Sequence, residues 1–290
     1  MNLKEIKMSK IGVAVCGNSG LDYMVHDKEI RIFRSLLLIG EKEYEDFIEI
    51  TAEDFYDRIT KDPELDIKTA QTSTGKIYEM YQEMLQSGYD ELIVITISKH
   101  LSGTYQNAIL AAKMIENTPI HVFDSQSLSH VEATMANVAK KMADEGANAA
   151  AILEELSWIR DHNHIYVCVD TLKYLVKNGR LSNAAGFFGT LLKLKPLLEI
   201  SQEGKVETLE KIRTTAKARE AMLNHFKNDI RGKKAEVFII YTNNMAEMFD
   251  LQEELENYEG VSEVKLIPLT PVVGCHAGPG TMGLGYIEKK

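Results

Sequence analysis

The feature that most constrains the fold is an alternation of short apolar runs with amphipathic stretches. Three apolar runs of strand length are IGVAVC (11–16), ELIVITI (91–97) and IHVFDS (120–125), and a longer run, 29–40, is expected to form one more strand. Stretches with helical spacing lie between them, at 51–60, 73–88 and 102–117. Such alternation predicts an α/β fold with a mostly parallel sheet and helices on both of its faces.

The second half of the chain continues the alternation. Strands are expected at 164–170, 196–201, 205–212, 235–242, 263–269 and 284–289, and helices at 183–194, 214–229 and 245–258. QEG (202–204) between two of these strands favours a hairpin. A helix over 149–161 precedes the strand at 164, so we predict two α/β domains, 1–163 and 164–290.

Composition and charge exclude several classes of protein. The 290 residues carry a net charge of −10, which disfavours a surface that neutralises nucleic acid phosphates. The sequence has no apolar run long enough to cross a membrane and no secretory signal at its start. Its three cysteines are too few and too scattered for a disulfide framework. We therefore expect a cytoplasmic protein with free thiols that does not bind nucleic acid.

The segment TISKHLSGTYQN (96–107) is the strongest candidate site. A buried strand ends near Ile97 and a helix is expected to begin near Ser102. Ligands of open α/β sheets bind beyond the carboxyl ends of strands, and a helix start favours an anion. Ser102 would then donate to a ligand and Gly103 would allow close approach, or Ser102 would only cap the helix.

Three further stretches are weaker candidates. Thr69 belongs to a cluster of hydroxyl residues before the helix at 73–88, and such clusters are usually loops and caps. Arg180 follows a glycine and either faces solvent or binds an acid. His276 lies in GCHAGPGTMG (274–283), where small neighbours cannot pack its ring, so a ligand and a structural role are both open.

Other arrangements lack essential parts. The pair His162 and His164 has no cysteine or acid at a recognised metal-site spacing, so no metal is expected. No G-x-S-x-G elbow, Walker loop or dinucleotide fingerprint is present, so no nucleotide cofactor is expected. Ser98, Lys99 and Ser102 could form a nucleophilic set with His276, but no acid that would orient the histidine is evident. We therefore assign no catalytic residue.

Taken in order, these stretches resemble the DegV family of fatty-acid-binding proteins. ISKHLSGTYQNA resembles the family's ISSxLSGTYQSA, YLVKNGRLS its YLxKGGRIS, KPLLEI its KPIL, VGCHAGPGTMG its IGxHxGPGxxG, and KTAQTS its PTSQPS. VFDS (122–125) matches a strand end of the family. The resemblance covers the chain from about Lys10 to the end, and the shared order of the motifs is specific although each single match is not.

The resemblance implies a long-chain fatty acid in an interior tunnel, with its carboxylate between two domains. Thr69, Ser102 and His276 would bind the carboxylate. The surrounding polar network would contain Ser19, Gly103, Arg180, Gly274 and Gly278. The resemblance also implies no cofactor in this chain, a separate ATP-dependent kinase subunit that forms an acyl phosphate for phospholipid synthesis, and transient contact with a membrane. The apolar stretch 184–200 could line the tail, or it could be ordinary core.

The sequence departs from the family at a few positions, and two other functions stay open. GNSG (17–20) replaces the family's TDST, with Asn18 in place of an aspartate, and Ala70 and Thr72 replace a serine and a proline. Lys99 replaces a serine and is expected to add a positive charge near the carboxylate. One alternative is a stand-alone acyl or phosphoryl transferase that uses Ser102 or His276. The other is a lipid carrier or sensor without a kinase partner.

Overall fold

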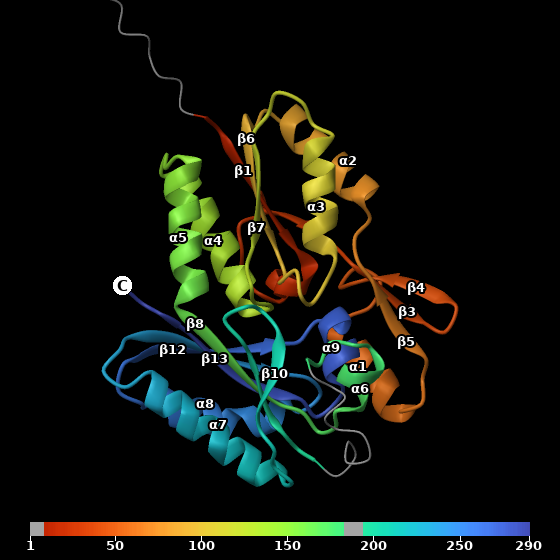
Figure 1. Cartoon of the computed structure of the whole chain (residues 1–290), viewed down its shortest axis with the longest axis vertical. Coiled ribbons are helices and arrows are strands. Elements are labelled where there is room, and N and C mark those ends of the chain that lie inside the picture. The colour runs from red at the N-terminus through yellow and green to blue at the C-terminus, as the bar shows by residue number, and fades with distance from the viewer. Residues whose placement is uncertain (1–8, 183–193) are drawn as a thin grey trace, which may run out of the picture.

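The computed structural model describes residues 9–182 and 194–290 and contains a four-stranded parallel sheet at its centre (Figure 1). The strand order is β2 (Arg31–Phe33), β1 (Ile11–Cys16), β6 (Glu91–Thr96) and β7 (Ile120–Asp124). Helices α4 (His130–Asp144) and α5 (Ala149–Asp161) lie on one side of this sheet, and α2 (Thr74–Gln86) and α3 (Thr104–Lys113) on the other. This arrangement confirms the predicted α/β architecture. Helices cover both faces of the parallel sheet, so every one of its strands can be apolar.

A six-stranded mixed sheet follows in the chain. Its order is β10 (Val206–Glu210), β9 (Leu197–Ile200), β8 (Asn163–Cys168), β13 (Met282–Glu288), β11 (Ala235–Tyr241) and β12 (Val261–Pro268). All neighbours are antiparallel except β11 and β12. Helices α7 (Thr215–Asp229) and α8 (Met248–Glu256) cover its outer face (Figure 1), and the short turn η5 (Met245–Glu247) precedes α8. The expected hairpin is confirmed by the antiparallel pair β9 and β10.

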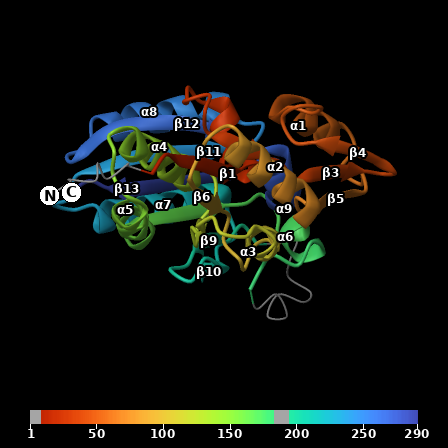
Figure 2. The ribbon, with the colours of Figure 1, turned by 90° about the horizontal axis from the view of Figure 1, so that it is seen from above.

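A third, smaller sheet lies beside the other two. It contains β4 (Lys42–Glu45), β3 (Leu36–Ile39) and β5 (Ile67–Ala70), all antiparallel. Helices α1 (Ala52–Lys61), α6 (Lys173–Lys177) and α9 (Pro271–Ala277) gather next to it, as Figure 2 shows from above. Two short turns, η1 (Gly17–Ser19) and η2 (Leu21–Tyr23), follow β1. Segments that are far apart in sequence therefore meet around the end of the central sheet.

Side-chain caps begin several of the predicted helices where the sequence placed them. The Thr51 side chain accepts the backbone N–H of Asp54 at the start of α1. The Ser73 side chain accepts the backbone N–H of Lys76 at the start of α2. Helix α3 differs from the prediction, because it starts at Thr104 and Gly103 occupies the cap position. Ser102 is therefore one residue too early to be the cap.

The expected single strand over 29–40 is wrong, because the chain changes sheets inside it. Residues 31–33 pair with β1, whereas residues 36–39 pair with β4 and β5. The carbonyl of Ser35, between the two strands, accepts the backbone N–H of Asp46 at 3.2 Å, which directs the chain into the small sheet. An unbroken apolar run does not reveal such a change of partner.

The stretch 274–283 is also more regular than expected. Its first part belongs to the helix α9, which Thr270 caps through the N–H of Val273 and Pro271 begins. A threonine cap followed by proline at the first helical position is a helix start that the sequence displays. The expected helix over 183–194 lies almost entirely outside the described residues.

One hydrophobic core extends through both sheets. A single cluster of buried residues includes Val94 and Ile95 of the four-stranded sheet and also Leu198 and Ile240 of the six-stranded sheet. A second cluster, which includes Phe226 of α7 and Val237 of β11, lies between the six-stranded sheet and its outer helices. The division into domains 1–163 and 164–290 stays a prediction. Because one buried cluster contains residues of both sheets, the region between the two sheets lies in the interior of the molecule.

Candidate functional site

A cavity of about 110 Å³ lies between the two larger sheets. This is several times the space that a single enclosed water molecule needs. Its polar lining residues are Asn18, Ser35, Thr69, Gln71, Ser102, Arg180 and His276. Its apolar lining residues are Ala70, Ile97, Leu101, Leu128, Val167, Val169, Leu175, Leu198, Ile200, Val206, Ile240, Leu269, Val272, Val273 and Ala277. The cavity is therefore amphipathic, and none of the described residues that line it is acidic.

The inner face of the six-stranded sheet supplies much of the apolar wall. Val167, Leu198 and Ile240 point into the cavity from β8, β9 and β11. Their neighbours Tyr166 and Leu197 pack into the second cluster under the outer helices. Successive side chains of a strand point to opposite faces, so one sheet closes a core on one side and forms an apolar wall on the other.

Thr69 and His276 meet across 207 positions of sequence at the polar end of the cavity. Their Oγ1 and Nε2 atoms lie 3.0 Å apart. Thr69 is on β5 and His276 is near the end of α9, which packs against β3 and β5. The predicted grouping of these two residues is therefore present in the structure, although each came from a separate motif.

His276 is held in its neutral form. Burial, reinforced by the positive charge of Arg180, lowers the pKa of His276 to about 4. Its Nδ1 atom is buried and has no hydrogen-bond partner among the described residues. A neutral imidazole carries one donor and one acceptor, so His276 retains hydrogen-bonding capacity beyond its contact with Thr69.

Ser102 faces the cavity just before helix α3. Its Oγ atom lies 2.8 Å from the Thr104 hydroxyl and accepts the backbone N–H of Thr104 at 3.3 Å. The Gly103 N–H donates to Oε1 of Gln71 at 3.1 Å, and a Cβ atom at Gly103 would lie 2.5 Å from the amide of that side chain. The absence of a side chain at Gly103 therefore lets Gln71 close against the helix start.

Arg180 brings a positive charge to this end of the cavity. Its Nε donates to the carbonyl of Leu101 at 3.2 Å, and its guanidinium also donates to the carbonyl of Asn178. No carboxylate pairs with it within residues 9–182 and 194–290. A guanidinium carries five donors, so its carbonyl contacts leave both charge and donors for an anion.

Three predicted residues have their described contacts elsewhere. Ser19 is fully buried and accepts the backbone N–H of Leu21 at 3.2 Å. A Cβ atom at Gly274 would lie 2.0 Å from the hydroxyl of Tyr56, and one at Gly278 would lie 2.3 Å from the ring of Tyr174. These glycines let tyrosine side chains pack closely against α9 and its end.

Sequence reasoning missed Asn18, Ser35 and Gln71 as lining residues. Asn18 is only 4% exposed, and its Oδ1 atom has no hydrogen-bond partner among the described residues. It lies in η1, two residues after the end of β1, so the rule that ligands bind beyond the carboxyl ends of strands could have identified it. Ser35 gave no signal, because it lay inside an expected strand.

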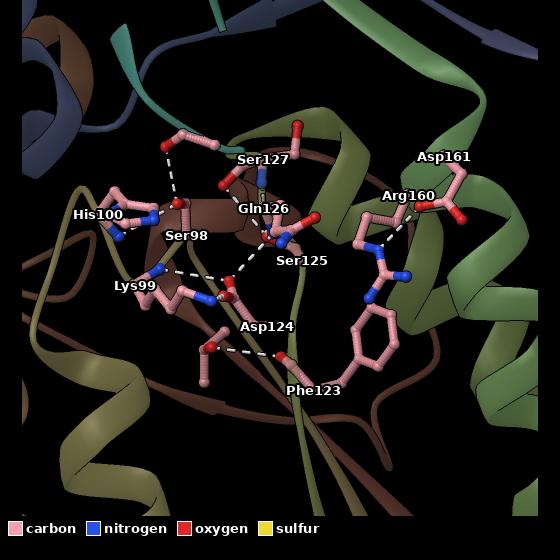
Figure 3. A network of polar contacts seen from close by, with 12 residues as sticks. Ser98, Lys99, His100, Phe123, Asp124, Ser125, Gln126, Ser127, Arg160 and Asp161 are labelled. Carbon is pink, nitrogen blue, oxygen red and sulfur yellow. Dashed lines mark hydrogen bonds and ion pairs between the residues drawn. The ribbon is translucent and has the colours of Figure 1, made fainter. Parts of the chain in front are cut away.

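Lys99 does not place its charge where we expected it. Its side chain is 42% exposed, and its Nζ atom lies 3.4 Å from Oδ2 of Asp124 (Figure 3). It is not among the lining residues of the cavity. The expectation that Lys99 adds a charge near the carboxylate is therefore wrong, because the side chain turns outward to Asp124.

Two negative findings apply to the described parts of the chain. No cluster of three or more histidine, cysteine or acidic residues there could hold a metal ion. Every helix there is too short or too polar to span a lipid bilayer. The three cysteines are all buried and free.

Comparisons with known proteins identify the family. The sequence model described as "Uncharacterised protein, DegV family" matches residues 14–289. A DegV domain-containing protein of Staphylococcus aureus is 31% identical over 251 residues, which cover 86% of each chain.

Solved structures of similar proteins match over nearly the whole length. A DegV family protein from Thermus thermophilus, described by its fatty acid binding, is 29% identical, with a TM-score of 0.87 over 97% of this chain and 100% of that one. DegV from Bacillus subtilis, described as a fatty acid binding protein, is 28% identical, with a TM-score of 0.84 over the same shares.

Proposed function

This chain belongs to the DegV family, and from that membership and the amphipathic cavity we propose that it binds one long-chain fatty acid. The tail would lie along the apolar wall, and the carboxylate would lie at the polar end. Similar proteins from Thermus thermophilus and Bacillus subtilis are described as fatty acid binding, which supports this choice of ligand.

The observation that carries the proposal is the composition of the cavity. An apolar wall meets a neutral histidine and an arginine, and none of the described lining residues is acidic. Burial of an acyl chain contributes about 0.8 kcal/mol per methylene, and an unpaired buried carboxylate would be costly. Arg180 and the hydroxyl groups of the polar end offset that cost.

The roles that we propose keep the predicted set and enlarge it. Thr69, Ser102 and His276 bind the carboxylate. Gly103 and Arg180 belong to the surrounding network, and Ser19, Gly274 and Gly278 support it through contacts outside the cavity. We add Asn18 and Ser35, because both line the cavity and the side-chain amide NH2 of Asn18 and the hydroxyl of Ser35 are groups that donate hydrogen bonds. Donors in such numbers suit a headgroup with several lone pairs.

We further propose that the bound acid is presented to a separate ATP-dependent kinase subunit. That subunit would form the acyl phosphate for phospholipid synthesis, and this chain would act in the cytoplasm with transient contact to a membrane. The resemblance to the family supports these steps. Ser102 and Arg180 line the cavity from segments between helices and strands, and we propose that the partner's phosphoryl group approaches the carboxylate from that side.

The test is direct identification of the ligand. The purified protein is extracted with chloroform and methanol, and the extract is analysed by mass spectrometry. We expect about one long-chain fatty acid per chain. When the delipidated protein is titrated with hexadecanoic acid, it should again bind about one molecule per chain. Repeated extracts without lipid, together with no binding in the titration, would refute the proposal.

A further inference from the structure

The loop that carries Ser102 begins with a tight turn. The carbonyl of Ser98 accepts the backbone N–H of Leu101 at 2.9 Å and that of Ser102 at 3.2 Å. The turn fixes the direction in which Ser102 leaves β6, but it provides no partner for the N–H of Lys99. The position of Ser102 in the cavity therefore depends on what holds the turn itself.

Asp124 holds the turn from the neighbouring strand. Its Oδ1 atom accepts the backbone N–H of Lys99 at 3.2 Å and that of Gln126 at 3.1 Å (Figure 3). Asp124 is the last residue of β7 and pairs in register with Thr96 of β6. Its carboxylate is 11% exposed. One mostly buried oxygen therefore joins the loops that follow two adjacent parallel strands.

The loop after β7 is itself in an unusual conformation. Gln126 has a φ of 49°, which residues other than glycine seldom adopt. Its N–H bonds to Asp124, and the next residue, Ser127, accepts the backbone N–H of Ser98 at 3.0 Å. The two loops thus hold each other, with Asp124 bonded to both.

The six-stranded sheet holds the same loop from the opposite side. The Ser98 hydroxyl donates to the carbonyl of Gly204, in the turn between β9 and β10, at 2.7 Å. A Cβ atom at Gly204 would lie 2.3 Å from that hydroxyl oxygen. Arg180 bonds to the carbonyl of Leu101. The turn is therefore held both by the loop after β7 and by residues of the second half of the chain.

We propose that Asp124 is a positioning residue that acts on the ligand through Ser102. It does not line the cavity, so its effect on binding is exerted through the backbone of the loop. This inference rests on the proposed function, because the measured quantity is the affinity for a fatty acid. It assigns a role to the VFDS motif, whose aspartate has no contact with the proposed headgroup site.

The chemistry of the contact determines the variants. Asp124→Ala removes the acceptor of both N–H groups, whereas Asp124→Asn keeps a carbonyl oxygen that can accept both. Lys99→Met removes only the partly exposed ion pair and leaves the backbone contacts. The proposal predicts that loss of the acceptor weakens binding and that loss of the charge alone does not.

The experiment is a titration of each delipidated variant with hexadecanoic acid, followed by calorimetry. We expect Asp124→Ala to raise the Kd about tenfold or more, the scale of a lost hydrogen bond. Asp124→Asn and Lys99→Met should stay within about threefold. In a Ser102→Ala background, Asp124→Ala should add less than about threefold, because the residue through which it acts is gone.

Each alternative outcome is distinct. Fully additive effects of Asp124→Ala and Ser102→Ala, or an unchanged Kd for folded Asp124→Ala, would overturn the inference. Equal losses for Asp124→Ala and Lys99→Met would do so too, because the charge would then be what matters. If Asp124→Ala does not fold, the same cycle is run with Asp124→Ser, whose side chain is too short for both contacts. Failure of the wild-type protein to bind would instead count against the proposed function.

Discussion

Two histidines, His130 and His276, line cavities of this molecule, and the charged groups around them differ. His130 is 2% exposed, and its Nε2 atom lies 2.7 Å from Oε1 of Glu236. The ammonium of Lys265 lies 3.1 Å from the same oxygen. His276 bonds instead to the hydroxyl of Thr69, and its charged neighbour is Arg180. The difference is that one histidine has a carboxylate from the protein and the other does not.

That difference separates a structural contact from a binding site. Burial alone would raise the pKa of Glu236, but His130 and Lys265 outweigh it and lower that pKa to about 2. At His276 burial and a cation act in the same direction and keep the ring neutral. The polar end of the cavity has a cation and no described acid, so an anionic ligand would complete its charge. At His130 the carboxylate of Glu236 already pairs with the ammonium of Lys265.

The largest expected effect is on acyl phosphate formation. His276→Ala, with fatty acid bound and a cognate kinase subunit added, should slow the reaction about 100-fold, the scale of lost acid–base or electrostatic assistance. The matched control is His130→Ala, which should leave the rate near normal once folding is verified. Equal rates for the two variants would remove the distinction between the histidines. ATP turnover without the partner would favour the stand-alone enzyme.

The next effect is on the free energy of unfolding, through the contact between His130 and Glu236. The pKa of Glu236 lies below the ordinary value of 4.5, so its stabilisation is present above pH 4.5 and is lost as the pH falls toward 2. Glu236→Gln should therefore lower the free energy of unfolding by about 3 kcal/mol at pH 7 and flatten its dependence on pH in that window. Chemical denaturation at several pH values measures both. Fatty acid affinity should not change.

Sequence reasoning recovered most of the framework, and its errors have physical causes. The strands of the central sheet are buried on both faces, so runs such as 91–97 are continuous and easily recognised. The change of sheet at Arg34 and Ser35 left no such mark, because partner choice depends on tertiary contacts. Helix α9 could have been predicted from Thr270 and Pro271, but the glycines of 274–283, only one of which lies in the helix, favoured a ligand-binding backbone instead.

The candidate site was predicted unevenly. Thr69, Ser102, Arg180 and His276 line one cavity, as the order of the motifs implied. The contact between Thr69 and His276 spans 207 positions, so no local pattern encodes it. The apolar wall of the cavity was visible only in part, because strand alternation does not tell which face of a sheet a ligand uses. Lys99 was misplaced because a loop side chain can turn either way.

The stability contributed by His276 should also depend on pH. The pKa of His276 is lowered from 6.5 to about 4, so the unfolded chain binds more protons in that window and stability falls as the pH drops. The loss attributable to His276 between pH 7 and pH 5 should be about 2 kcal/mol. It is measured as the difference between wild type and His276→Gln. Bound fatty acid should reduce the difference, because a carboxylate favours the protonated ring.

Ser102→Ala tests the hydroxyl beside the helix start. If Ser102 donates to a buried carboxylate, the variant should bind fatty acid more weakly by about 1.5 kcal/mol. The structure gives Ser102 a contact with the N–H of Thr104 as well, so a small loss of stability should accompany it. An unchanged affinity, measured with thermal unfolding in parallel, would leave Ser102 with the local contact alone.

The smallest expected effect concerns the second cation of the comparison, Lys265. Its side chain is 32% exposed and pairs with both Glu236 and Glu263, so solvent screens the attraction. Lys265→Met should lower the free energy of unfolding by about 0.5 kcal/mol and leave fatty acid affinity unchanged. Arg180→Met should have the opposite profile, with a clear loss of affinity, because Arg180 has no carboxylate partner among the described residues. Similar profiles for the two variants would show that the charge around each histidine does not determine its role.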